Sequence, residues 1–193
     1  MNTANKITFS RLIFIPIIMF LYLAEFIPYG KLIAMVLFIV ASLTDMLDGH
    51  VARKYNMVTN LGKFMDPIAD KVLVMAGLML IFADNILPDL LLILTATIMF
   101  ARDYIIDSLR QIGASRGKII AAAKSGKIKA FMLDVAIIFA MLIGANAQSF
   151  NITGVIYNVS ITLTYAVFGI AVILVIYSLF EYLIKNKSVF QGE

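Results

Sequence analysis

The sequence predicts an all-α membrane protein, a polytopic bundle of six transmembrane helices. Three observations support this fold class. Of the 193 residues, 62% are hydrophobic and only 15% are charged, which is far more apolar than a soluble domain. Long uncharged runs, such as residues 12–24 and 32–44, are typical of membrane-spanning helices. Because no internal repeat or break in composition divides the chain, we expect a single domain over residues 1–193.

The first three predicted spans lie in the amino-terminal half of the chain. Phe9–Tyr29 ends in a Pro-Tyr-Gly break, Lys31–Val51 runs into a group of charged residues, and Phe64–Ala83 follows a short polar connection. Each segment has about the 20 residues that a helix needs to cross the hydrocarbon core. The sequence therefore predicts three closely connected spans here.

The last three predicted spans are similar in length and apolar character. Asp89–Gln111 begins directly after Pro88, Ile128–Ala147 follows a basic loop, and Tyr157–Ile184 follows a polar connection. Proline, glycine and charged residues interrupt the apolar runs at these boundaries. Together with the first three, these segments give the six predicted spans.

Basic residues favour one side of the predicted spans. Lys31 is the only basic residue in the connections between spans one and two, three and four, and five and six. The chain ends and the other connections carry most of the remaining lysines and arginines. By the positive-inside rule, both termini and the polar site described next face the cytoplasm of a multi-pass protein in the cell membrane. The positive charge therefore belongs to this face, and we expect no nucleic-acid partner.

Four aspartates form the candidate chemical site. Asp45 and Asp48 are three residues apart near the end of the second span, and Asp66 and Asp70 are four apart at the start of the third. These spacings put each pair on one helix face, and the short connection makes the two helices antiparallel neighbours. All four carboxylates can therefore converge, and one or two divalent cations would neutralise them. Because the chain has no cysteine and only one histidine, His50, such a site suits hard cations such as Mg2+ or Mn2+.

Two other interpretations of the aspartates are open. Structural ion pairs with Arg53 and Lys71 would anchor the helix ends, although four aspartates at helical spacing favour an ion site. A cation transporter would also use membrane carboxylates, but it would hold them near the midplane between paired repeats. Here they lie near one face. Pro67 follows Asp66, and we expect it in the first turn of its helix, where proline is tolerated.

Small and basic residues accompany the aspartates. Gly49 and Ala52 leave bare backbone near the end of the second span, where a ligand can approach closely, and Gly62 does the same before the third. The guanidinium group of Arg53 is a fixed fork that suits a phosphate or a carboxylate.

Basic residues at the end of the fourth span and in the loop after it predict a pocket for a ligand that carries a phosphate. Arg102 lies about two helical turns before Arg110, and Lys124 and Lys127 follow in the next loop. Arg110, Lys124 and Lys127 would make this pocket positive, although the positive-inside rule alone also accounts for lysines here. For Arg102, a structural ion pair with the adjacent Asp103 is the rival interpretation.

The aspartate segment resembles the signature of a known enzyme family. Its pattern, Asp45-x2-Asp48-Gly49-x2-Ala52-Arg53-x8-Gly62-x3-Asp66-x3-Asp70, is similar at all eight positions to that of the CDP-alcohol phosphotransferases. The resemblance implies a six-helix membrane enzyme that transfers a group from a CDP-linked lipid to an alcohol and releases CMP. It implies that Asp45, Asp48 and Asp66 hold two Mg2+ or Mn2+ ions, and that Asp70 joins the second ion and acts as general base. The residues that it implies for the CDP pocket are Gly49, Ala52, Arg53 and Gly62.

Two further segments resemble one branch of that family. They are Asn5-x2-Thr8-x2-Arg11 and the region that contains Arg110, Lys124 and Lys127. In this branch CDP-diacylglycerol is the donor, sn-glycerol 3-phosphate is the acceptor, and phosphatidylglycerophosphate is the product. The resemblance implies that Asn5 and Thr8 contact the CDP moiety, although they would equally suit an amphipathic lead-in. Inositol phosphate, serine and phosphatidylglycerol are the alternative acceptors. A homodimer surrounded by membrane lipids is also implied.

Overall fold

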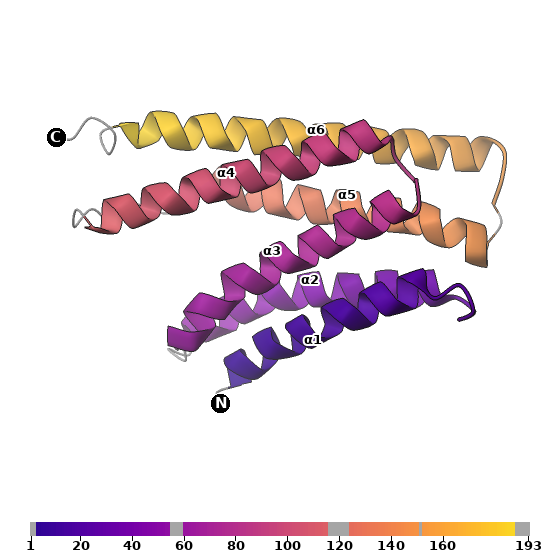
Figure 1. The fold of residues 1–193 in the computed structure, drawn as a ribbon, viewed down its shortest axis with the longest axis horizontal. Helices are drawn as coiled ribbons and strands as arrows, with labels where there is room; N and C mark the ends of the chain where they lie inside the picture. The colour runs from indigo at the N-terminus through magenta and orange to yellow at the C-terminus, as the bar shows by residue number, and fades with distance from the viewer. Residues whose placement is uncertain (1–2, 55–59, 116–123, 151, 188–193) are drawn as a thin grey trace. The chain divides into compact units, whose positions relative to one another are not determined.

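The computed structural model describes residues 3–54, 60–115, 124–150 and 152–187 (Figure 1). Side chains are described for residues 9–44, 62, 65–115, 125–146, 149–150 and 152–187. This part of the chain forms six α-helices and no strand, which confirms the predicted all-α class. The helices are α1 (Thr3–Leu23), α2 (Gly30–Lys54), α3 (Asn60–Ala83), α4 (Asp89–Ser115), α5 (Lys124–Ser149) and α6 (Val155–Lys185).

Each helix overlaps one predicted span, and the largest differences are at the two ends of the first, where α1 begins at Thr3 instead of Phe9. That span was predicted to reach Tyr29, whereas α1 ends at Leu23. A turn follows, in which the Ile27 amide donates to the Ala24 carbonyl at 3.1 Å and Tyr29 has a left-handed φ of 59°. Pro28 disfavours helical backbone at the residue before it, and so the chain reverses here before α2 begins.

The expected place of Pro67 in a first helical turn is wrong. Because α3 begins at Asn60, Pro67 lies inside the helix. Proline has no amide hydrogen, so the carbonyl group four residues earlier, at Lys63, loses its helical hydrogen-bond partner. The helix nevertheless continues to Ala83, and membrane helices tolerate proline in this way.

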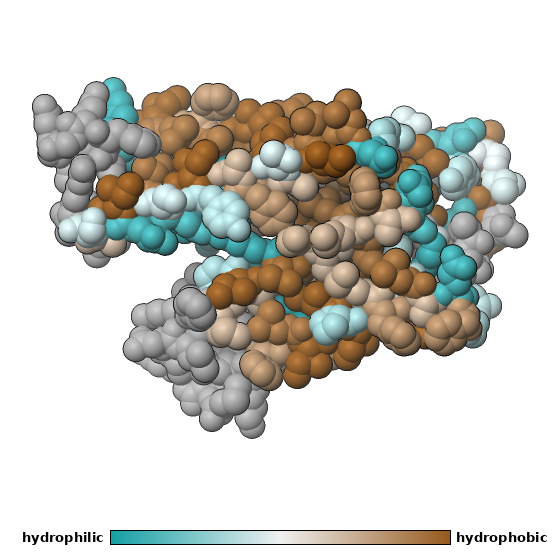
Figure 2. Space-filling view, viewed as in Figure 1, coloured by the Kyte–Doolittle hydropathy of each residue, from teal (hydrophilic) through white to brown (hydrophobic). Residues whose placement is uncertain are grey.

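Hydrophobic side chains dominate much of the visible surface, notably over α6 (Figure 2). Phe26, in the turn after α1, is 78% exposed, and Ile173 on α6 is 67% exposed. In the described part of the chain, two helical segments are long and apolar enough to cross a membrane, Ser125–Asn146 and Val155–Lys185. These features indicate membrane association, and the number of six spans stays a prediction.

The chain divides into two compact units, which are described separately. The first unit, residues 1–87 and 137–162, contains α1, α2 and α3 with the end of α5 and the start of α6. The second unit, residues 88–136 and 163–193, contains α4 with the start of α5 and the end of α6. In the first unit α1 packs against both α2 and α3, and α2 also contacts α3. This packing fixes the two helices that carry the four predicted site aspartates.

A polar cluster joins the helices at the other end of the first unit. The Tyr22 hydroxyl donates to Asp84 Oδ2 at 3.1 Å, and Lys31 forms an ion pair with the same carboxylate. The Lys31 amine also lies 5.4 Å from the centre of the Tyr22 ring. Gly144 on α5 makes room for this cluster, because an added Cβ would lie 2.1 Å from the Tyr22 hydroxyl and 2.4 Å from Asp84 Oδ2.

We therefore expect Gly144→Ala to destabilise the protein by about 1–3 kcal/mol, the usual cost of overpacking. Tyr22 is 1% exposed, so its hydroxyl cannot move aside into solvent. The measurement is the midpoint of thermal unfolding, Tm, in detergent. Gly169→Ala is the matched control, because a Cβ there meets no heavy atom within 4 Å. An equal Tm for both variants would contradict the proposed close packing at Gly144.

Candidate active site

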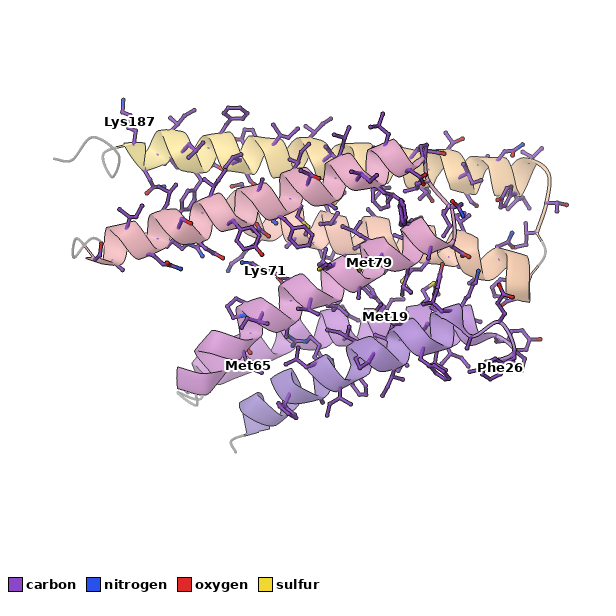
Figure 3. The ribbon with its side chains drawn as sticks, in the orientation of Figure 1. Met19, Phe26, Met65, Lys71, Met79 and Lys187 are labelled. Carbon is purple, nitrogen blue, oxygen red and sulfur yellow. The ribbon has the colours of Figure 1, made fainter. Side chains whose placement is uncertain are left out.

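The four aspartates lie on two contacting helices of the first unit. Asp45 and Asp48 are in the second half of α2, and Asp66 and Asp70 are in the first half of α3. The segment with Asp66 and Asp70 lies between Met65 and Lys71, which Figure 3 labels. The Asp66 side chain is exposed and the Asp70 side chain is half-buried. The side chains of Asp45 and Asp48 lie outside the described residues, so the convergence of all four carboxylates stays a prediction.

The donor set fits a divalent cation. Carboxylate oxygens are the ligands that Mg2+ and other hard cations prefer, and Asp66 and Asp70 are one helical turn apart, which places them on the same face. No group of three or more metal-binding side chains occurs among the described ones, which do not include Asp45 and Asp48.

Most residues predicted to bind CDP are only partly described. Gly49, Ala52 and Arg53 belong to α2, and Asn5 and Thr8 belong to α1, but their side chains lie outside the described residues. Gly62 is buried on α3. The contacts predicted for these six residues stay predictions.

Arg11 is the last residue of the Asn5-x2-Thr8-x2-Arg11 motif, and it lies in the packed part of α1. Its side chain is 2% exposed and is among the largest fully buried side chains of the chain. A buried guanidinium group is costly unless polar groups surround it. The sequence placed Arg11 at helical spacing after Thr8, but spacing alone could not show its burial.

In the second unit Arg102 belongs to an ion-pair network. Its Nη1 donates to Asp103 Oδ1 at 2.7 Å, and its Nε donates to Ser178 Oγ on α6 at 3.1 Å. Lys129 on α5 donates to the same Asp103 carboxylate at 2.9 Å. Arg102 is 9% exposed and Lys129 is 6% exposed. Of the two interpretations of Arg102, the ion pair is therefore the one that the structure contains.

Arg102 and Lys129 carry two buried positive charges, and the single carboxylate of Asp103 balances one of them. The backbone of α5 also comes close to the guanidinium group of Arg102. An added Cβ on Gly126 would lie 3.0 Å from Arg102 Nη2, so a glycine lets the guanidinium group pass beside α5. The network ties together α4, α5 and α6. Sequence reasoning named Arg102 and Asp103 but missed Lys129 and Ser178, which are far away in sequence.

The predicted phosphate-binding residues are more open. The side chains of Arg110 and Lys127 are exposed, and Lys124 is the first residue of α5, although its side chain lies outside the described residues. Arg110 Nε donates to the Tyr182 hydroxyl at 3.3 Å, and its guanidinium carbon lies 5.8 Å from the centre of the Tyr182 ring. Hydrophilic side chains gather along the visible side of α4 (Figure 2). Arg110 and Lys127 thus present positive charge at an accessible surface.

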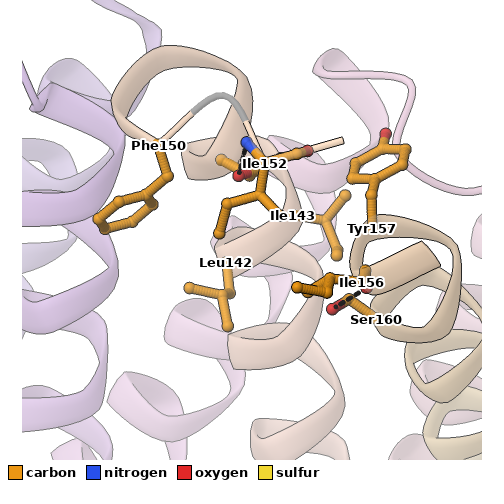
Figure 4. A pocket seen from close by; sticks show the side chains of 8 residues that line it. Leu142, Ile143, Phe150, Ile152, Ile156, Tyr157 and Ser160 are labelled. Atoms are coloured by element: carbon orange, nitrogen blue, oxygen red, sulfur yellow. Dashed lines mark hydrogen bonds between the residues drawn. The ribbon is translucent and has the colours of Figure 1, made fainter. Parts of the chain in front are cut away.

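A separate pocket of about 180 Å3 lies between the end of α5 and the start of α6 (Figure 4). Two of its polar side chains bond within the chain: the Asn146 amide donates to the Ile152 carbonyl and accepts from the Ile152 amide, and the Ser160 hydroxyl donates to the Ile156 carbonyl. The pocket is therefore apolar and unsuited to a nucleotide or a phosphate. Its lining residues are Leu142, Ile143, Asn146, Phe150, Ile152, Ile156, Tyr157 and Ser160.

Comparison with known proteins agrees with the motif. The model of the CDP-alcohol phosphatidyltransferase family matches residues 1–184. Over 147 residues the chain is 40% identical to a CDP-diacylglycerol--glycerol-3-phosphate 3-phosphatidyltransferase of Bacillus subtilis (strain 168), an alignment that covers 70% of this chain and 74% of the relative. A Rickettsia typhi protein of the same name is 38% identical over 134 residues, covering 68% and 71%. A third, from Salmonella choleraesuis, is 30% identical over 187 residues, covering 94% and 93%.

Proposed function

Because the chain belongs to the CDP-alcohol phosphatidyltransferase family, we propose that it transfers a phosphatidyl group from CDP-diacylglycerol to sn-glycerol 3-phosphate. The products are phosphatidylglycerophosphate and CMP, and the protein is an enzyme of phospholipid synthesis. The observation that carries this proposal is the shared name of relatives that align with up to 94% of the chain. The aspartate motif independently supports the reaction class.

The aspartates supply the metal site in this proposal. Two divalent ions, either Mg2+ or Mn2+, are held by Asp45, Asp48, Asp66 and Asp70. Carboxylate oxygens are suitable ligands for both kinds of cation. When bound, the ions polarise the pyrophosphate of the donor and neutralise negative charge on the departing CMP. The CDP moiety lies against the backbone of small residues and the forked side chain of Arg53. Its proposed contacts are Asn5, Thr8, Gly49, Ala52, Arg53 and Gly62.

Asp70 acts as the general base. Its carboxylate takes the proton from the acceptor hydroxyl of glycerol 3-phosphate. The hydroxyl oxygen then bonds to the phosphorus that carries the diacylglycerol, while the bond from this phosphorus to the CMP oxygen breaks. CMP leaves with the bonding electron pair, and the proton stays on Asp70 until solvent removes it. Support comes from the half-buried position of Asp70, one turn after Asp66 on a packed helix.

Arg110, Lys124 and Lys127 bind the phosphate of the acceptor. The exposed guanidinium group of Arg110 can donate two parallel hydrogen bonds to phosphate oxygens, and the lysines add positive charge. Serine and phosphatidylglycerol lack a free phosphomonoester group, so they would use such a pocket poorly. The pocket therefore favours an acceptor that carries a phosphate, such as glycerol 3-phosphate or inositol phosphate, and the names of the relatives favour the first of these.

The protein forms one domain over residues 1–193 and crosses the cell membrane six times, with both termini and the active site in the cytoplasm. Support comes from α3 and Asp84, which directly follows it: Asp84 is eighteen positions after Asp66, a helical rise of about 27 Å. The hydrocarbon core is about 30 Å thick, so the site aspartates and the pair of Lys31 and Asp84 suit opposite faces. A homodimer is part of the proposal through the family resemblance alone.

The test is CMP release by the purified protein in detergent, with CDP-diacylglycerol and either Mg2+ or Mn2+. Glycerol 3-phosphate is compared with inositol phosphate, serine and phosphatidylglycerol. We expect release with glycerol 3-phosphate, loss of release with excess EDTA, and recovery when the divalent cation is restored. Release only with another acceptor would overturn the acceptor assignment, and activity that persists in EDTA would overturn the metal site.

A further inference from the structure

Tyr182 is a buried tyrosine near the end of α6, in the second unit. It is 1% exposed and packs in an apolar cluster with Ile106 and Leu109 of α4. Its carbonyl accepts hydrogen bonds from both the backbone amide and the side-chain amide of Asn186, at 3.1 and 2.8 Å. The ring and the backbone of Tyr182 are therefore fixed in place.

The hydroxyl of this fixed ring contacts Arg110. A buried tyrosine hydroxyl normally finds a hydrogen-bond partner, and here it accepts from Arg110 Nε at 3.3 Å. The guanidinium carbon lies 5.8 Å from the ring centre, which is within the range of a cation–π interaction. Two contacts from one rigid side chain thus hold a guanidinium group that belongs to an otherwise exposed residue.

The contact with Tyr182 uses only one of the five N–H groups of Arg110. A guanidinium group has one N–H on Nε and four on the two terminal nitrogens, so the terminal fork keeps its four donors. Two parallel N–H groups match two phosphate oxygens. Tyr182 therefore fixes the base of the fork and leaves its tip for a ligand.

Arg102, two helical turns earlier, is held in a different way. Its Nε donates to Ser178 on the same helix α6, but its Nη1 donates to the carboxylate of Asp103. A carboxylate neutralises the charge of the arginine that it binds, whereas a tyrosine hydroxyl does not. Arg110 is thus oriented by a neutral partner, which keeps its full positive charge for an anion.

We propose that Tyr182 is a positioning residue for the acceptor: it orients Arg110 so that the guanidinium fork receives the phosphate of glycerol 3-phosphate. This inference rests on the proposed role of Arg110 in acceptor binding. A free arginine side chain loses many rotamers when it binds a ligand, and a side chain that is already ordered loses fewer. Tyr182 therefore lowers the KM for the acceptor and has no part in the chemical step.

The first test is Tyr182→Phe, which removes the hydroxyl and keeps the ring. We expect the KM for glycerol 3-phosphate to rise about 3- to 10-fold, the size of one hydrogen bond, with kcat and the KM for CDP-diacylglycerol unchanged. Tyr177→Phe is the matched control, because it makes the same change on the same helix at a side chain that is 58% exposed. Equal acceptor KM values for Tyr182→Phe and the wild type would overturn the proposal.

The second test separates positioning from a merely structural role. In an Arg110→Ala background, Tyr182→Phe is expected to cause no further rise in KM, because the residue that it orients is absent. An additional rise of the original size would overturn the proposal. Arg110→Lys serves if Tyr182→Phe fails to fold. Lysine keeps the charge but lacks the fork, so we expect a KM close to that of Arg110→Ala, and a wild-type KM would overturn the proposal.

The same experiments distinguish an error in the proposed function from an error in this inference. If the wild-type protein releases no CMP with glycerol 3-phosphate, the reaction assignment is wrong before any variant is measured. If Arg110→Ala keeps the wild-type KM, the acceptor pocket is wrong, and the positioning role of Tyr182 falls with it. If Arg110→Ala raises KM but Tyr182→Phe does not, only the inference about Tyr182 is wrong.

Discussion

Replacing Asp70 with asparagine is expected to lower kcat for CMP release by about 10²- to 10⁴-fold, the usual contribution of a general base. Asparagine has nearly the same shape, but its amide cannot take the proton from the acceptor hydroxyl. Because Asp66 and its partners on α2 remain, CDP-diacylglycerol should still bind in the presence of Mg2+. The measurements are CMP release under saturating substrates and metal-dependent binding of the CDP-lipid to the purified variant.

Asp84→Asn is the matched control for this prediction. It makes the same substitution in the same unit, fourteen residues further along, or about 21 Å if the helical rise continues. Lys31 and Tyr22 lose the charge of their partner, so we expect a lower Tm with kcat unchanged. Near-normal kcat for Asp70→Asn would show that another group is the base. Loss of CDP-lipid binding together with kcat would instead assign Asp70 to the metal site alone.

The helices could be predicted from the sequence because their signals are local. Apolar runs of sufficient length, interrupted by residues such as Pro28 and Pro88, locate all six helices. The ends were less accurate, since hydropathy continues past the last helical hydrogen bond, as it does after Leu23. Pro67 was misplaced for the opposite reason: α3 begins before its apolar run, and hydropathy did not reveal that the polar residues before Phe64 are already helical.

The contacts of the basic residues could not be predicted, because they join distant parts of the chain. The sequence left open whether Arg102 binds a ligand or forms an ion pair with Asp103, and it gave no sign of the contact with Ser178, 76 residues away. Lys129 lies in a basic segment that the positive-inside rule explains, and only its burial against Asp103 distinguishes it from Lys127. Spacing thus predicted the aspartate site, whereas packing decided which cations are enclosed and which are exposed.

Replacing Arg110 with alanine is therefore expected to raise the KM for glycerol 3-phosphate by about 10- to 100-fold, because charge-assisted hydrogen bonds to a phosphate are lost. The KM for CDP-diacylglycerol should stay unchanged, since the donor is bound elsewhere in the proposal. Initial rates of CMP release at varied acceptor concentration measure this effect.

Lys187→Ala is the control for Arg110→Ala, because it also removes one positive charge but lies exposed beyond the end of α6 (Figure 3). A general electrostatic attraction of the acceptor would make the two variants similar, and salt would weaken both effects. A specific phosphate contact affects only Arg110→Ala. If instead Arg110→Ala lowers kcat and leaves the acceptor KM unchanged, the guanidinium group acts after binding, and the phosphate must be bound by other residues.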